Sequence, residues 1–288
     1  MKLRIFSTIL SLILIFSITL FAQNNEAKKA FNEANTAFRQ GKVDVALQKY
    51  QEAVKFDPGF AFAYYGMGNV YKKRKDYVNA ENAYKSAIEK DNKFVKAYNY
   101  LGYVQYRQGR FAEAINSYKA ALDIDPQFEK AYWGIGDVYR KQQKYAQAVE
   151  QYQQAVALDP KNINALRGLG VSLMELGKNE EAIGALEEAV KHIRNRSLKS
   201  DAYFRIGNAY RELGKYSEAE SAYKNCLASA RKSSIKAGAN FGLGEIYKKR
   251  RNNRQAITYY TAASKDRMWK KSAEYEIDLL KNPDKYAN

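Results

Sequence analysis

Cysteine, histidine and proline are scarce in this chain: its 288 residues include one cysteine, one histidine and four prolines. The single cysteine, Cys226, excludes an internal disulfide and a cysteine-rich metal site. His192 is the single histidine, so the common zinc ligand sets are not expected. Because His192 lies beside Arg194 and Arg196, we interpret it as a solvated surface residue. The low proline content, with many Ala, Lys, Gln and Glu residues, favours helix.

Motifs that carry catalysis are also missing. The sequence has no G-x-x-x-x-G-K-[ST] phosphate loop. Its paired carboxylates, such as Glu187 with Glu188, are predicted to lie on charged helix faces, whereas a glycoside hydrolase needs two carboxylates in one cleft. We therefore expect a protein that is not an enzyme and that has no cofactor and no metal site.

Acidic residues are fewer than basic residues: the chain has 31 Asp and Glu residues and 48 Lys and Arg residues, which gives a net charge of +17. A surface of this kind attracts anions: acidic proteins, anionic lipids, phosphate-bearing polymers or nucleic acid. The charge therefore bears on the partners of the protein and not on its fold.

A long apolar run occurs at the N-terminus, from Ile5 to Phe21, after the positive charges of Lys2 and Arg4. The small residue Ala22 and then polar sequence follow, which is typical of a cleaved secretory signal. The alternative is an uncleaved anchor, although a membrane span needs about 20 apolar residues. Residues 1–22 are therefore predicted to export the remainder of the chain to the periplasm or cell envelope of a bacterium. No cysteine follows the run to carry a lipid anchor.

The remainder of the chain repeats itself with a period of 34 residues. Seven units begin near Ala27, Ala61, Val95, Glu129, Ile163, Ser200 and Ala237. Matching positions hold an aromatic residue (Tyr64, Tyr98, Tyr132), a glycine (Gly68, Gly102, Gly136), an alanine (Ala80, Ala114, Ala148), a tyrosine (Tyr84, Tyr118, Tyr152), a second alanine (Ala87, Ala121, Ala155) and a residue that closes the unit (Asn92, Pro126, Pro160).

This pattern resembles the tetratricopeptide repeat, W-x-x-L-G-x-x-Y followed by A-x-x-x-F, A and P. The resemblance covers everything from about Ala27 onward. It implies an all-α fold, a right-handed α-solenoid of antiparallel helix pairs. The last two units start 37 residues after their predecessors. The insertions, near His192 to Lys199 and Arg231 to Ile235, are expected to lengthen a turn or a second helix without breaking a pair.

Small residues are expected where helices cross closely, at Gly68 and Ala80 within a pair and at Ala87 towards the next unit. Cys226 occupies the same place as Ala87, so we predict that it is buried. The seven repeats would fill residues 23–268. Residues 269–288 are expected to form a capping helix and tail, because Trp269, Ala273, Ile277 and Leu280 make an apolar stripe at helical spacing that ends before Pro283.

The resemblance also implies a concave groove lined by the first helix of each unit, with positions 2, 5, 9, 12 and 13 pointing inward. In units one to four these positions combine aromatic residues, which anchor partners well, with cations that favour an acidic partner. We predict that the groove binds a protein or an extended acidic, partly apolar peptide. The predicted groove residues are Phe31, Asn35, Arg39, Tyr65, Asn69, Lys73, Lys96, Tyr103, Arg107, Lys130, Trp133, Arg140 and Lys141.

The simplest alternative is a basic face that is merely solvated and binds no partner. Three further interpretations concern the basic surface of the chain. The carboxylate clamp of some family members is not expected, because only Asn35 and Lys96 match its residues. A basic face that binds an anionic envelope polymer or a membrane surface is the main alternative, motivated by the runs Lys72 to Lys75 and Lys248 to Arg251. Nucleic acid is not an expected partner of an exported protein. The sequence does not define the oligomeric state or what units five to seven bind.

Overall fold

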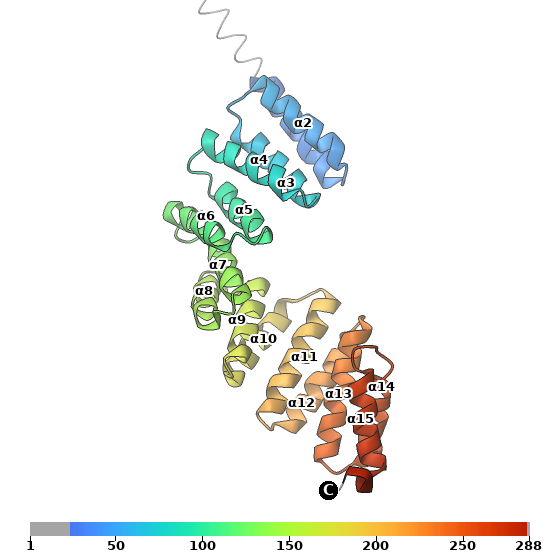
Figure 1. Cartoon of the computed structure of the whole chain (residues 1–288). Helices are drawn as coiled ribbons and strands as arrows, with labels where there is room; N and C mark the ends of the chain where they lie inside the picture. Colours follow the sequence, from blue (N-terminus) through green and yellow to red (C-terminus); the bar gives the residue numbers. More distant parts are fainter. Residues whose placement is uncertain (1–23, 287–288) are drawn as a thin grey trace, which may run out of the picture. The chain divides into compact units, whose positions relative to one another are not determined.

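The structure is a computed structural model that describes residues 24–286, and within this range every regular element is helical (Figure 1). The predicted signal segment, residues 1–22, lies outside the described residues. A first helix occupies residues 24–39. The later elements are α2 (Val43–Phe56), α3 (Ala61–Lys73), α4 (Tyr77–Lys90), α5 (Val95–Arg107), α6 (Phe111–Ile124), α7 (Glu129–Lys141), α8 (Tyr145–Leu158), α9 (Ile163–Glu175), α10 (Asn179–His192), α11 (Arg196–Glu212), α12 (Tyr216–Ser229), α13 (Ser233–Lys249), α14 (Asn253–Ala263), α15 (Lys270–Lys281) and the 3₁₀ turn η1 (Pro283–Tyr286).

Successive helices pack against each other in pairs, which confirms the predicted all-α solenoid of helix pairs. Four first helices begin at the predicted unit starts, Ala61, Val95, Glu129 and Ile163. The two insertions break no helix pair, as expected, but the prediction that they lengthen a turn or a second helix was wrong. The extra residues lengthen the following first helices, α11 and α13, which have 17 residues where α3 has 13.

The chain divides into two compact units inside α7, one ending at Gly134 and the other beginning at Ile135. The predicted groove residues from Phe31 to Trp133 therefore belong to the first unit. Arg140 and Lys141 belong to the second.

A buried tyrosine on the second helix organises most of the helix pairs. Its ring covers a glycine of its own first helix: a Cβ built on Gly68 would lie 2.5 Å from Cε1 of Tyr84. In several pairs the ring also covers a glycine of the next first helix: a Cβ built on Gly168 would lie 2.3 Å from Cζ of Tyr152. The predicted close helix crossings are thus present, and the bulky partner at the crossing is the tyrosine ring. A larger side chain than glycine would force the helices apart.

The turn inside each pair places one residue in the left-handed region, as helix C-termini often do. In the first pair the residue with this conformation is a glycine, Gly41, with φ of 79°. Lys75 and Arg251 take the same conformation with φ of 61° and 58°, directly after the basic ends of α3 and α13. The basic runs therefore end first helices as predicted, where positive charge also suits the helix dipole.

The C-terminal helix α15 covers the last pair, as predicted. Ala273 is fully buried with Tyr260 of α14, and Trp269, Ile277 and Leu280 pack against the same cluster. The helix ends at Lys281, before Pro283. Cys226 is fully buried among the residues of α12 and α13, which confirms its predicted burial, and burial raises the pKa of its thiol to about 12.

Candidate functional site

Positions 2, 5, 9, 12 and 13 of a first helix share one face, because helical residues advance by about 100° each. On α3 this face carries the exposed side chains of Phe62 and Lys73 and the partly buried side chain of Tyr65. Ala63 and Val70, at positions 3 and 10, are fully buried against the second helices. We call the side of a first helix that carries positions 2, 5, 9, 12 and 13 the first-helix face. On α3 this face includes exposed side chains.

An aromatic cluster lies along this face in the first unit. We define it by the following six residues: Phe31, Phe60, Phe62, Tyr65, Phe94 and Tyr100. Its ring centroids are in near contact from one repeat to the next: Phe62 lies 4.8 Å from Phe94, and Phe94 lies 5.0 Å from Tyr65. At the N-terminal end, Phe31 lies 5.0 Å from Phe60. Phe62 is 51% exposed, so the cluster presents apolar surface to solvent.

Four of the six cluster residues, Phe60, Phe62, Phe94 and Tyr100, were absent from the predicted groove. Phe60 and Phe94 directly precede first helices and recur with the 34-residue period, which is the signal that would have found them. Phe62 occupies position 2, where the prediction considered only the lysines of other repeats. The predicted residues Phe31 and Tyr65 do belong to the cluster.

Tyr100 is unusual because it stands at position 6, where the neighbouring repeats have glycine, as at Gly66 and Gly134. Its ring stacks on the buried ring of Tyr84, with 5.9 Å between centroids and 17° between planes. The Nζ atom of Lys72 lies 3.6 Å from the centroid of Tyr100. This cation is partly withdrawn from water, and burial lowers the pKa of Lys72 to about 8.

Two other cations of the face also lie over aromatic rings. Lys73 lies 5.1 Å from the centroid of Phe38, and Arg107 lies 5.0 Å from that of Tyr77. Arg107 also donates a hydrogen bond of 2.7 Å to the hydroxyl of Tyr103. Among the described residues no carboxylate forms an ion pair with five cations of this face: Arg39, Lys72, Lys73, Lys96 and Arg107. Their charges are therefore not neutralised by ion pairs within the described residues.

The predicted polar residues at position 9 have a structural role that the sequence analysis missed. Asn35 and Asn69 accept hydrogen bonds through Oδ1 from the hydroxyls of Tyr50 and Tyr84, at 2.7 and 2.9 Å. Both side chains are partly buried, so they hold the helix pair together as well as lining the face.

Asn99, at position 5 between Tyr65 and Trp133 in the repeat register, is 6% exposed. Its Oδ1 has no hydrogen-bond partner among the residues of the described structure. A buried acceptor without a partner costs about 1–3 kcal/mol of stability. The face therefore contains one unsatisfied polar group.

The fourth-repeat residues are placed less uniformly. Lys130 is exposed and pairs with Glu129 at 3.7 Å, while Trp133 is partly buried. In the second unit, Arg140 donates to the hydroxyl of Tyr152 and to Asp137, both at 3.1 Å, so it is committed to the helix pair. Lys141 is exposed.

Other features bear on chemistry. Within residues 24–286, no three or more His, Cys, Asp and Glu side chains gather closely enough to hold a metal ion. In the same range, no helix is both long and apolar enough to traverse a bilayer. His192 was predicted to be a solvated surface residue. Its side chain is instead partly buried, and its Nε2 lies 3.1 Å from Oε1 of Glu188.

Family models match nearly the whole repeat region. The model described as "TPR repeat" matches residues 34–75, 68–109, 106–143 and 136–177. Two models described as "Tetratricopeptide repeat" match residues 162–232 and 204–267. The chain belongs to the tetratricopeptide repeat family. A search of the curated proteins finds no significant match.

Solved structures share this fold at low identity. The C-terminal part of a TPR repeat-containing protein from Cytophaga hutchinsonii is 16% identical, covers 86% of this chain and 99% of its own length, and has a TM-score of 0.68. PilF of Pseudomonas aeruginosa is 16% identical over 72% of this chain and 93% of its own, with a TM-score of 0.64.

A third structure, YrrB, is 23% identical and covers 67% of this chain and 98% of its own, with a TM-score of 0.59. It is described as a TPR protein with an unusual peptide-binding site. These likenesses establish the fold. Tetratricopeptide folds bind protein or peptide partners and are generally non-catalytic, which suggests a protein–protein interaction scaffold.

Proposed function

We propose that this protein is a non-catalytic scaffold of the bacterial cell envelope, and that the first-helix face of its first unit binds an extended acidic, partly apolar peptide or protein segment. The observation that carries the proposal is the aromatic cluster with Lys72 beside it, a partly buried cation that no carboxylate of the described chain neutralises.

The chemistry of the face defines the partner. Phe62 and the rings around it offer apolar surface at which a leucine or aromatic side chain would lose its contact with water. Lys72, Lys73 and Lys96 offer positive charge on the same face. A partner carboxylate next to Lys72 would gain from the reduced exposure of this amine to water. The proposed partner therefore combines acidic and apolar side chains.

Export rests on the N-terminal sequence. The apolar run from Ile5 to Phe21 after Lys2 and Arg4 supports secretion to the periplasm or envelope. The mass of the purified protein from an expressing bacterium tests this proposal: loss of residues 1–22 supports a cleaved signal, and the full mass in a membrane fraction supports an anchor.

The binding proposal is tested with residues 23–288 as bait in an envelope extract at low and at roughly physiological salt. In the test variant, Phe62→Ser and Lys96→Ser remove an exposed ring and an exposed cation from the face. In the matched control, Val78→Ser and Lys119→Ser remove an exposed apolar residue and a cation from second helices. A protein that is retained at higher salt by the wild type and the control, and lost by the test variant, supports the proposal.

The second candidate is a basic surface that binds an anionic polymer or membrane. The runs that end α3 and α13 favour it. Three of their cations are already paired, however: Arg74 with Asp44, Lys248 with Glu276 and Arg250 with Glu220. Recovery of polymer or lipid that falls steeply with salt, and equally on all baits, would favour this candidate over the peptide face.

A further inference from the structure

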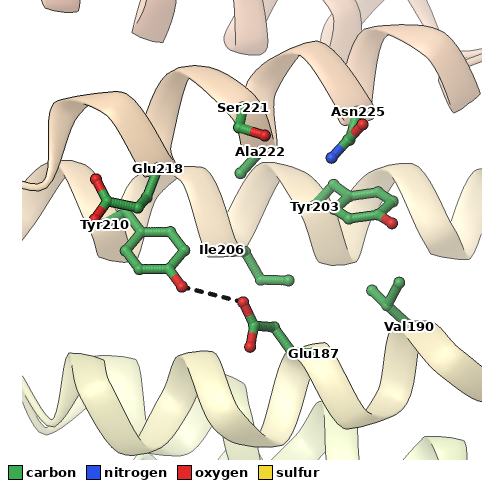
Figure 2. A pocket seen from close by; sticks show the side chains of 9 residues that line it. All are labelled: Glu187, Val190, Tyr203, Ile206, Tyr210, Glu218, Ser221, Ala222 and Asn225. Atoms are coloured by element: carbon green, nitrogen blue, oxygen red, sulfur yellow. Dashed lines mark hydrogen bonds between the residues drawn. The ribbon is translucent and has the colours of Figure 1, made fainter.

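A cavity of about 350 Å³ opens in the second unit between α10, α11 and α12. Figure 2 shows side chains from all three helices converging on it. Tyr203, Ile206 and Tyr210 of α11 form its base, with Glu187 and Val190 on one side and Glu218 and Asn225 on the other. We call it the α10–α12 pocket. Its volume falls within the range of about 300–1,000 Å³ that ligand sites occupy.

We call the three buried side chains at the bottom of the pocket, one from each helix, its floor, and all three are apolar. Val190, Ile206 and Ala222 are 8%, 2% and 5% exposed, and they belong to well-packed helices. The two tyrosine rings stand at either end of Ile206 (Figure 2). Such a floor favours an apolar side chain that gains by leaving water.

The rim is acidic in a strongly basic chain. The hydroxyl of Tyr210 donates to Oε1 of Glu187 at 3.1 Å. Burial, the hydrogen bond to Glu187 and the nearby charge of Glu218 raise the pKa of Tyr210, so both carboxylates act on one end of the pocket. Neither carboxylate forms an ion pair with any residue that the structure describes. The neighbouring cations Lys191 and Lys224 are engaged by Glu188 and Glu220 instead.

No other repeat carries two carboxylates at these positions. The equivalents of Glu187 and Glu218, taken pairwise at the other five junctions between repeats, are Gln51 and Asn79, Lys85 and Glu113, Lys119 and Gln147, Gln153 and Glu181, and Lys224 and Gln255. The repeat architecture alone therefore does not explain the acidic pair.

We propose that the α10–α12 pocket binds a basic amphipathic helix of a partner protein, which places apolar side chains on Ile206 and a lysine or arginine against Glu187 and Glu218. The base fits such a helix, because Tyr203 and Tyr210 lie seven residues apart on α11. This distance is about 10.5 Å, or two helical turns. This site is separate from the face proposed above and attracts the opposite charge.

The test uses a synthetic helical peptide of roughly 14 residues, a length at which isolated helices become marginally stable. Its leucines are spaced three and four residues apart, and lysines flank them. A matched peptide carries glutamate in place of every lysine. Methyl NMR signals of Val190, Ile206 and Ala222 in the whole chain report on occupancy of the pocket. We expect the lysine peptide to shift these signals and the glutamate peptide to leave them unchanged.

Two variants locate the interaction. The double variant Glu187→Gln and Glu218→Gln should weaken the binding of the lysine peptide severalfold, as the loss of two exposed ion pairs does. The control, Glu150→Gln with Glu175→Gln, removes two exposed carboxylates elsewhere and should bind as the wild type does. Ser221→Trp, at an exposed rim position, should block the pocket without touching its floor.

The proposal is overturned if the lysine peptide leaves the three methyl signals unchanged, or if the double variant and the control bind it equally. Binding of the glutamate peptide at these methyl groups would overturn it as well. The glutamate peptide is also a probe of the first-unit face, where shifts of Tyr65 and Tyr100 would report it. Failure at one site is thus distinguishable from failure at the other.

Discussion

Replacing Lys72 by methionine is expected to stabilise the protein at pH 7 and to weaken the binding of an acidic peptide. Methionine keeps an unbranched apolar stem on the ring of Tyr100 and removes the charge that lies 3.6 Å above it. The charged form of Lys72 is disfavoured in the folded chain, because burial lowers its pKa from 10.5 to about 8.

The magnitude follows from this shift, since one pKa unit corresponds to about 1.36 kcal/mol. The full shift would therefore give roughly 3 kcal/mol. The side chain retains some contact with water, and its attraction to the Tyr100 ring, about 0.5–2 kcal/mol, opposes the gain. We expect Lys72→Met to raise the free energy of unfolding by about 1–2 kcal/mol at pH 7.

The pH dependence has a defined sign. Between about pH 8 and 10 the unfolded chain keeps a proton on Lys72 that the folded chain has released, so the stability of the wild type rises with pH in this window. Above about pH 10 buried tyrosines act in the opposite direction, since burial raises the pKa of Tyr65 to about 12. The rise should be absent in Lys72→Met.

Urea unfolding followed by far-UV circular dichroism at pH 7, 8, 9 and about 10 measures both effects. Lys73→Met is the matched control, because Lys73 is the adjacent, exposed residue and should change stability by less than about 0.5 kcal/mol. Destabilisation by Lys72→Met, or the same pH profile in both variants, would refute the reasoning. Fluorescence anisotropy of a labelled acidic peptide should show at least about tenfold weaker binding for Lys72→Met.

Three further changes test the packing. Gly168→Ala should lower stability by about 1–2 kcal/mol, because its Cβ would meet a buried ring at 2.3 Å, whereas Gly184→Ala, with nothing within 4 Å, should raise it by up to about 1 kcal/mol; equal effects in urea unfolding would contradict the crossing geometry. Asn99→Leu should raise the free energy of unfolding by about 1 kcal/mol, because it removes the unsatisfied acceptor. Asn69→Leu should lower the free energy of unfolding by about 1–3 kcal/mol, because it removes the acceptor of the Tyr84 hydroxyl. A change of the same sign in both variants would contradict this assignment. Trp269→Ala should lower the melting temperature, with a loss of about 2 kcal/mol, because its ring lies against α13 at the open end of the last pair; an unchanged melting curve would show that α15 does not cap the stack.

Part of the candidate face could be predicted from the sequence, because a helix fixes which positions share a side. Phe31 and Tyr65 lie in the aromatic cluster, and Lys73 and Lys96 are exposed beside it, as the repeat register indicated. The face was incomplete without Lys72, whose importance comes from the ring of Tyr100 on the neighbouring repeat. Contacts between repeats depend on how side chains meet, which position numbers do not define.

The sequence by itself determined the repeat, the helix pairs and where most of them begin, because small residues recur wherever two helices must approach closely. In the second pair, Ala63, Gly68 and Ala80 leave the room that this close approach needs. The C-terminal cap was equally readable, since Trp269 and the apolar residues after it share one helical face.

Only the tertiary structure decided which helix absorbed the two insertions, because a longer α11 and a longer turn leave the same repeat pattern. It also gave Glu187 a role beyond solubility, by bringing it to the hydroxyl of Tyr210 at the edge of a pocket. These features arise where side chains of three helices converge. Their chemistry depends on burial and on distance across the stack, and neither quantity exists until the chain is folded.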